Sequence, residues 1–162
     1  MAEPKGYSRG QIGLHWIIAL LLVPQFLLHD GIKAAFREMM KGGAASYDAM
    51  VLLHVVGGLL ILVLMLWRVA LRMDRGVPPP PAGESAVQKR VASAVHGLLY
   101  LVLFLLPLSG LAAWFGAAGA AAEFHELMKP LLLILVALHV LGALYHQFVL
   151  KTGLIDRMRH PA

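Results

Sequence analysis

The segment EFHELMKPLLLILVALHVLGALYHQF, residues Glu123–Phe148, carries three histidines, His125, His139 and His146, in an otherwise apolar run. A single helix crosses the ~30 Å hydrocarbon core of a bilayer with about 20 residues, so this run is long enough to do so. An imidazole without a partner is costly to bury in such a helix. The segment therefore predicts a membrane helix, and the rest of the chain must supply the partners of its histidines.

The composition of the whole chain also indicates a membrane protein. Of its 162 residues, 59% are hydrophobic and only 14% are charged, with a mean hydropathy of +0.74, which is far from the average soluble domain. The chain has no cysteine, which excludes disulfides, thiolate zinc sites, iron–sulfur clusters and haem attached covalently through CxxCH. The net charge of +5 indicates basic loops beside lipid rather than nucleic-acid binding.

Four segments are long and apolar enough to span a bilayer. They cover residues 11–29, 47–71, 88–115 and 124–150. The proline-rich stretch 72–88 is expected to be a linker, since proline does not fit a helix interior. The 29–47 link is expected to hold a short amphipathic helix that ends at Gly42-Gly43. We therefore predict a single all-α domain over residues 1–162, an integral membrane four-helix bundle whose last two helices are antiparallel neighbours.

The basic residues predict the orientation of this bundle. With the N-terminus inside, ten basic residues face the cytoplasm: Lys5, Arg9, Arg68, Arg72, Arg75, Lys89, Arg90, Lys151, Arg157 and Arg159. Four face outward: Lys33, Arg37, Lys41 and Lys129. The positive-inside rule then places both termini in the cytoplasm. No small-residue cleavage site follows the first apolar run, so we expect no cleaved signal peptide.

Seven of the eight histidines lie within or at the ends of these segments, and the orientation sorts them into two layers. The outer layer contains His29, His54 and His125. The inner layer contains His15 and His96, with His139 and His146 approaching it along the last helix. The 14 residues from His125 to His139 rise about 21 Å and end about 40° short of whole turns, so both rings point into the bundle at different depths. His146 follows on the same stripe, roughly 10 Å deeper.

Neutral imidazoles buried in pairs across helices, at two levels, are typical of haem held by two axial histidines. At the outer level, the similar depths of His54 and His125 support a pair formed by these two histidines. At the inner level depth alone allows His139, His146 or His96 opposite His15. Nearby glycines either leave room for the edge of a macrocycle or let helices pack closely. These are Gly57, Gly58, Gly97 and Gly142.

Five blocks resemble the bacterial cytochrome b561 family, whose members are di-haem, four-helix membrane cytochromes. In chain order they read YSRGQIGLHW, LLHVVGGLLILVLMLWRVALR, HGLLYLVLFLLPLSGL, FHE and ALHVLGALYHQF, and they extend from Tyr7 to about Met158. The resemblance implies two haem b groups in a bacterial inner membrane. It implies His15 and His139 as ligands of the inner haem iron, and His54 and His125 as ligands of the outer one.

The resemblance also implies roles for other polar residues on the cytoplasmic side. His96 and His146 are expected to bind a quinone or relay its protons. Three arginines either pair with haem propionates or quinone oxygens, or anchor the cytoplasmic loops. They are Arg9, Arg68 and Arg72.

The resemblance implies transmembrane electron transfer between an outer donor and ubiquinone, in either direction. One family relative of similar length and block order oxidises superoxide outside the membrane and reduces ubiquinone, which makes superoxide an expected donor. The outer loops carry four basic and five acidic residues, so their bulk charge does not favour an anion. A local funnel remains expected from Lys33, Arg37, Lys41 and Lys129.

Two alternatives remain at this point. The same fold could serve as a haem b electron carrier for a separate dehydrogenase or hydrogenase, which would require a docking surface for that redox partner. A metal-ion transporter could also use membrane histidines. Transporters of this kind usually place carboxylates or methionines beside the histidines, whereas the spans here are expected to lack buried Asp or Glu apart from Glu126, near the outer boundary.

Overall fold

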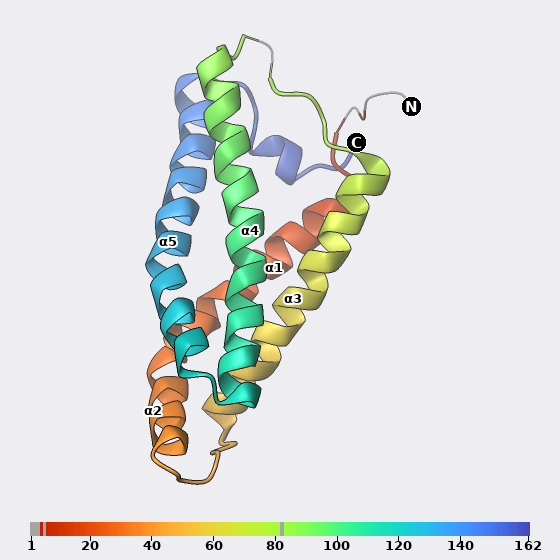
Figure 1. Ribbon diagram of the computed structural model, residues 1–162. Helices are drawn as coiled ribbons and strands as arrows, with labels where there is room; N and C mark the ends of the chain where they lie inside the picture. Colours follow the sequence, from red (N-terminus) through yellow and green to blue (C-terminus); the bar gives the residue numbers. More distant parts are fainter. Residues whose placement is uncertain (1–3, 5, 82) are drawn as a thin grey trace.

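The computed structural model describes residue 4, residues 6–81 and residues 83–162, and this part of the chain is helical without strands. Lys5, counted above for orientation, lies outside the described residues. The helices are α1 (Arg9–Leu27), α2 (His29–Met40), α3 (Ala49–Arg75), α4 (Ala86–Gly116) and α5 (Gly119–Leu144). A π-helical turn, Tyr145–Val149, continues α5, and a 3₁₀ turn covers Asp156–Met158 (Figure 1). All helices but α2 are long and apolar enough to cross a membrane, which confirms the predicted fold class.

Capping residues set where the long helices begin. Ser8 and Gln11 form a capping box at the start of α1, and Ser85 and Gln88 form one at the start of α4. In each box the serine hydroxyl accepts from the glutamine N–H, and the glutamine side chain accepts from the serine N–H. The C-terminal end of α3 lies at Arg75. Gly76 follows it with a φ of +71° and ends the helix. The connection between α3 and α4 therefore covers residues 76–85, where the sequence suggested 72–88.

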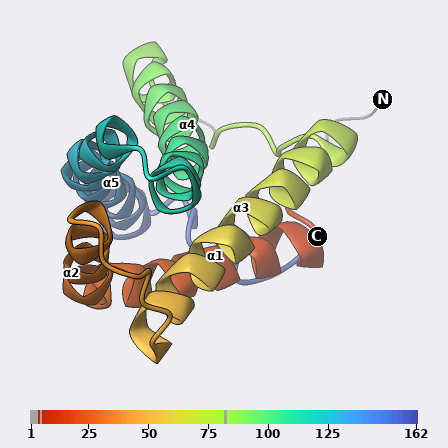
Figure 2. The ribbon, with the colours of Figure 1, turned by 60° about the horizontal axis from the view of Figure 1, so that its bottom comes forward.

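The short helix α2 confirms the amphipathic helix expected between the first two spans. It has a polar and an apolar face, ends at Met40, and is followed by Gly42 at a φ of +87°, a conformation that glycine adopts without strain. Asp48 then caps α3, because its side chain accepts from the N–H of Val51 at 2.9 Å. Helix α2 lies at the end of the bundle away from the chain termini (Figures 1 and 2).

The four long helices pack mainly as two pairs, α4 with α5 and α1 with α3, and α3 joins the pairs by packing on α4 (Figure 2). The antiparallel pairing of α4 and α5 was predicted from their short link and is confirmed. The buried core has two clusters. Val102, Leu106, Leu132 and Leu135 fill the α4–α5 contact. Ile18, Ile61 and Met65 fill the α1–α3 contact.

Both ends of the chain lie on one side of the bundle, which we call the terminal side (Figure 1). The N–H of Ala162 donates to the carbonyl of Tyr7 at 3.2 Å. The indole N–H of Trp16 donates to the carbonyl of Met158 at 2.8 Å. Four crossings return the chain to the side where it starts, as expected. That the terminal side is cytoplasmic remains a prediction from the basic residues.

Candidate functional site

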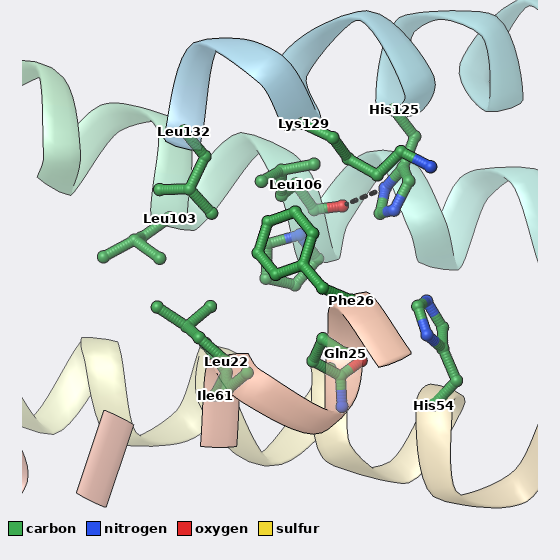
Figure 3. Close-up of a pocket in the computed structure, with 12 residues that line it drawn as sticks. Leu22, Gln25, Phe26, His54, Ile61, Leu103, Leu106, His125, Lys129 and Leu132 are labelled. Carbon is green, nitrogen blue, oxygen red and sulfur yellow. Dashed lines mark hydrogen bonds between the residues drawn. The ribbon is translucent and has the colours of Figure 1, made fainter. Parts of the chain in front are cut away.

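Near the α2 end of the bundle, His54 of α3 and His125 of α5 face each other across a pocket (Figure 3). Their ring centroids are 6.3 Å apart and the ring planes are inclined by 65°. The pocket encloses about 470 Å³ when its open part is included, and its other walls are mostly apolar, with Phe26, Ile61 and Leu132 among them. The structure thus brings together the two histidines expected at the outer level.

The ring of His125 is fixed by α4. Its Nδ1 lies 2.8 Å from the carbonyl oxygen of Leu106, the contact dashed in Figure 3. A carbonyl can only accept, so Nδ1 carries the proton and Nε2 keeps a lone pair for a metal. Ser109 Oγ lies 3.3 Å from the same Nδ1, and a Cβ added at Gly110 would lie 3.2 Å from the ring. Sequence reasoning missed Ser109 and Gly110, although the Pro-Leu-Ser-Gly interruption of an apolar run was a visible signal.

A wider cavity of about 1430 Å³, including its open part, extends from His54 and His125 towards α2. Lys33 and Arg37 line it, but Lys41 does not; Lys41 pairs with Glu38 at 2.9 Å and is exposed. The expected outer funnel therefore consists of fewer cations than the sequence suggested.

A charged cluster lies beside this cavity. Lys129 Nζ donates to Glu126 at 2.7 Å and lies 2.8 Å from Nδ1 of His29, while Lys33 approaches the same carboxylate at 3.5 Å. Two lysines thus share one glutamate, which leaves the cluster with an excess of positive charge.

Nearer the terminal side, three imidazoles come together. His15 of α1 lies 5.9 Å from His139 of α5, measured between ring centroids, and His96 of α4 lies 5.1 Å from His139. His15 and His139 are half-buried, whereas His96 is exposed. The Nδ1 of His96 lies 2.6 Å from the carbonyl oxygen of Ala92 in its own helix. The structure thus joins the two expected inner ligands and adds His96 beside them.

Two of the three expected arginines lie around Tyr100 at this level. Arg68 donates to Tyr100 Oη at 3.2 Å and to the carbonyl of Gln11 at 2.8 Å, which leaves other N–H groups of its guanidinium for a ligand. The guanidinium of Arg72 lies 5.5 Å from the centre of the Tyr100 ring. Arg9 is the exposed first residue of α1, and among the described residues no side-chain hydrogen bond or ion pair joins it to this group.

His146 lies apart from the three inner histidines. It belongs to the π-helical turn, and its Nδ1 lies 3.5 Å from a carboxylate oxygen of Glu84, whose side chain is only 7% exposed. Thr152 donates to the carbonyl of His146 at 3.2 Å. Within the described part of the chain, the ring of His146 contacts the ring of Tyr145, whereas the ring of His96 contacts that of His139.

The residues at both levels fit a haem. Two imidazoles that bind opposite sides of one iron, each at about 2 Å, put their ring centroids roughly 6 Å apart. The separations of 6.3 and 5.9 Å agree with this distance. His54 Nδ1 is covered and has no hydrogen-bond partner among the described residues, so this ring differs from that of His125, whose Nδ1 is bonded to Leu106.

The sequence left two roles open for the glycines near the histidines: room for the edge of a macrocycle, or close packing of helices. The structure supports each role at different glycines. A Cβ at Gly97 or Gly142 would meet nothing within 4 Å, so these two leave open space near the inner histidines. A Cβ at Gly57 would clash with the Gln25 side chain, so Gly57 serves the contact between α1 and α3. Across the described residues, no group of three or more His, Asp or Glu side chains has the arrangement of a metal-ion site.

The sequence is similar to known membrane cytochromes over nearly its whole length. A sequence model of the prokaryotic cytochrome b561 family matches residues 6–161. A cytochrome b562 of Cereibacter sphaeroides is 38% identical over 99% of both chains. A probable superoxide oxidase, CybB, of Yersinia pestis is 28% identical over 95% of this chain and 96% of its own. A cytochrome b561 homologue of Escherichia coli K12 is also 28% identical, over 94% of this chain and 96% of its own. The chain therefore belongs to the prokaryotic cytochrome b561 family, as a multi-pass membrane electron-transfer protein that binds haem b.

Proposed function

We propose that the protein carries electrons across the bacterial inner membrane through two haem b groups, from superoxide at the outer face to ubiquinone at the cytoplasmic face. The observation that carries this proposal is the pair of histidine contacts at two depths. His54 and His125 would hold the outer haem, and His15 and His139 the inner one. Their ring separations of 6.3 and 5.9 Å both suit two ligands of one iron.

When bound, each haem supplies an iron that accepts and releases one electron. The chain determines where this iron lies and what surrounds it. The apolar walls of the outer pocket exclude water from a bound macrocycle. The buried clusters around Leu132 and Ile61 lie along the helices between the two histidine levels and hold the helices at a fixed spacing.

On the terminal side, the side chains around the inner histidines suit a quinone. Arg68 offers its remaining N–H groups to quinone oxygens, and Tyr100 accepts a hydrogen bond that holds the guanidinium of Arg68 in place. Ubiquinone needs two electrons and two protons to become ubiquinol, and His96, exposed on this side, is suited to pass protons to it. His146, beside Glu84, is a second candidate for proton transfer.

At the outer face, the lining of the wider cavity supports an anionic donor. Lys33 and Arg37 line the cavity that leads to His54 and His125, beside the carboxylates Glu123 and Glu126. Lys129 also pairs with Glu126, so cations exceed carboxylates by one around this cavity, although the outer loops together have no excess positive charge. Positive side chains at the mouth of such a cleft raise the rate at which anions arrive. In the proposed reaction, two superoxide ions each lose one electron to give two molecules of oxygen, and ubiquinone takes up the two electrons and two protons. The similarity to the probable superoxide oxidase also supports this donor.

The test is ubiquinone reduction by the purified protein under a steady supply of superoxide. We expect ubiquinol to form with the protein present and to stop forming when superoxide dismutase is added. Replacing Arg37 with glutamine should slow reduction by superoxide about two- to tenfold at low ionic strength, and added salt should narrow this difference. Lys41→Gln is the matched control, because Lys41 lies outside the cavity and should leave the rate unchanged.

Two results would contradict parts of this proposal separately. If superoxide does not reduce the protein, yet ubiquinone reoxidises the protein after chemical reduction, the donor is another redox protein and the electron-carrier alternative holds. If Arg37→Gln and Lys41→Gln slow the reaction equally, the cavity lined by Arg37 is not the path of superoxide.

A further inference from the structure

The carbonyl of Leu106 accepts two hydrogen bonds from side chains around the outer pocket. The Nδ1–H of His125 reaches it at 2.8 Å (Figure 3), and the hydroxyl of Ser109 donates to it at 2.9 Å. The Ser109 oxygen is also 3.3 Å from Nδ1 of His125. The two donors therefore compete for one acceptor, and each hydrogen bond is weaker than it would be alone.

Gly110 makes this arrangement possible. A Cβ at residue 110 would lie 3.2 Å from Cε1 and 3.3 Å from Nδ1 of His125, closer than side chains usually pack. Any larger residue at this position would push the ring and change the contact with Leu106. One turn of α4 thus determines the position and the hydrogen bonding of His125 on α5. This turn contains Leu106, Ser109 and Gly110.

The strength of this hydrogen bond affects a metal bound at the other ring nitrogen. A stronger bond from Nδ1–H to a carbonyl gives the imidazole more negative character and makes Nε2 a better electron donor. A better donor stabilises ferric over ferrous iron and lowers the reduction potential, and hydrogen bonding to axial ligands is one of the means by which proteins tune haem.

We propose that Ser109 is a positioning residue that raises the reduction potential of the outer haem by sharing the Leu106 carbonyl with His125. This inference rests on the proposed function, in that His125 is taken as a ligand of the outer haem. Because Ser109 lies beside a ligand of the outer haem, the two haems would have different hydrogen-bonding surroundings. The higher potential at the outer level would favour acceptance of an electron from an outer donor.

The test is a redox titration of the purified protein followed by its visible spectrum, which resolves the two haems. Ser109→Ala should lower the outer potential by the equivalent of about a threefold change in the reduction equilibrium, roughly 28 mV at 59 mV per tenfold. The inner potential should not move. Ser109→Thr keeps the hydroxyl and should restore the wild-type value.

Gly110→Ala provides a second variant with the opposite expected sign. The added methyl group should displace the ring by a few tenths of an ångström, weaken its bond to Leu106 and raise the outer potential. Gly116→Ala is the control on the same helix, because a Cβ there would meet nothing within 4 Å, and it should shift neither potential.

Two outcomes would overturn the inference while leaving the proposed function intact. One is an outer potential that is unchanged in both Ser109→Ala and Gly110→Ala, with two haems bound. The other is an equal shift of both haems in Ser109→Ala, which would mean that Ser109 acts only on the packing of α4. A failure of the proposed site would be seen differently, as two haems remaining bound when His125 itself is removed.

Discussion

Replacing His125 with alanine is expected to leave about one haem per chain, and His54→Ala should give the same result. Each change removes one of the two imidazoles that face each other at 6.3 Å, and a haem with one remaining axial ligand in a half-open pocket should be lost during purification. His139 of the inner pair lies about 21 Å along α5 from His125, so the inner pair should be unaffected. The measurement is the haem content per chain, with the amplitude of the reduced-minus-oxidised spectrum falling to about half.

The double variant with both His54 and His125 replaced gives the sharper result. If the two histidines hold the same haem, the double variant should still contain one haem, with the same spectrum as either single variant. If they belong to different haems, it should contain none. His29→Ala is a suitable control, since His29 contacts Lys129 at the same depth and should leave both haems bound.

Much of the fold follows from local properties of the sequence. Runs of apolar residues long enough for a bilayer, the four-crossing order and the polar links were sufficient to predict the bundle, because a membrane helix satisfies its backbone hydrogen bonds within itself. The ends of α1 and α4 were also encoded locally, in the Ser-x-x-Gln boxes at Ser8 and Ser85. The expected boundaries differ there because apolar content, rather than capping, defined them.

The candidate site was only partly predictable, because residue spacing gives the depth of a side chain but not the rotation of its helix against the others. Depth was enough to put His54 near His125. It could not decide between His139, His96 and His146 as partners of His15. The structure sets His146 apart from the other two, because the π-helical turn at Tyr145–Val149 carries His146 to Glu84. Ser109 and Gly110 were missed for a related reason: their importance lies in a contact between two helices.

The inner site yields the second prediction with a large effect. His139→Ala should remove the inner haem and retain the outer one, whereas His96→Ala should retain both. His139 lies 5.9 Å from His15, close to the separation of two ligands on one iron, while the 5.1 Å between His96 and His139 is shorter than that separation. His96 is also exposed, whereas His15 and His139 are half-buried.

The same pair of variants separates a ligand from a residue that serves the quinone. If His96 passes protons to ubiquinone, His96→Ala should keep a wild-type haem content but slow ubiquinone reduction by about a hundredfold or more, the usual scale for loss of a general acid. Haem content and ubiquinone reduction should therefore be measured on the same preparations. Loss of a haem from His96→Ala, with two haems kept in His139→Ala, would make His96 the inner ligand. His139 would then be the residue whose imidazole faces the quinone.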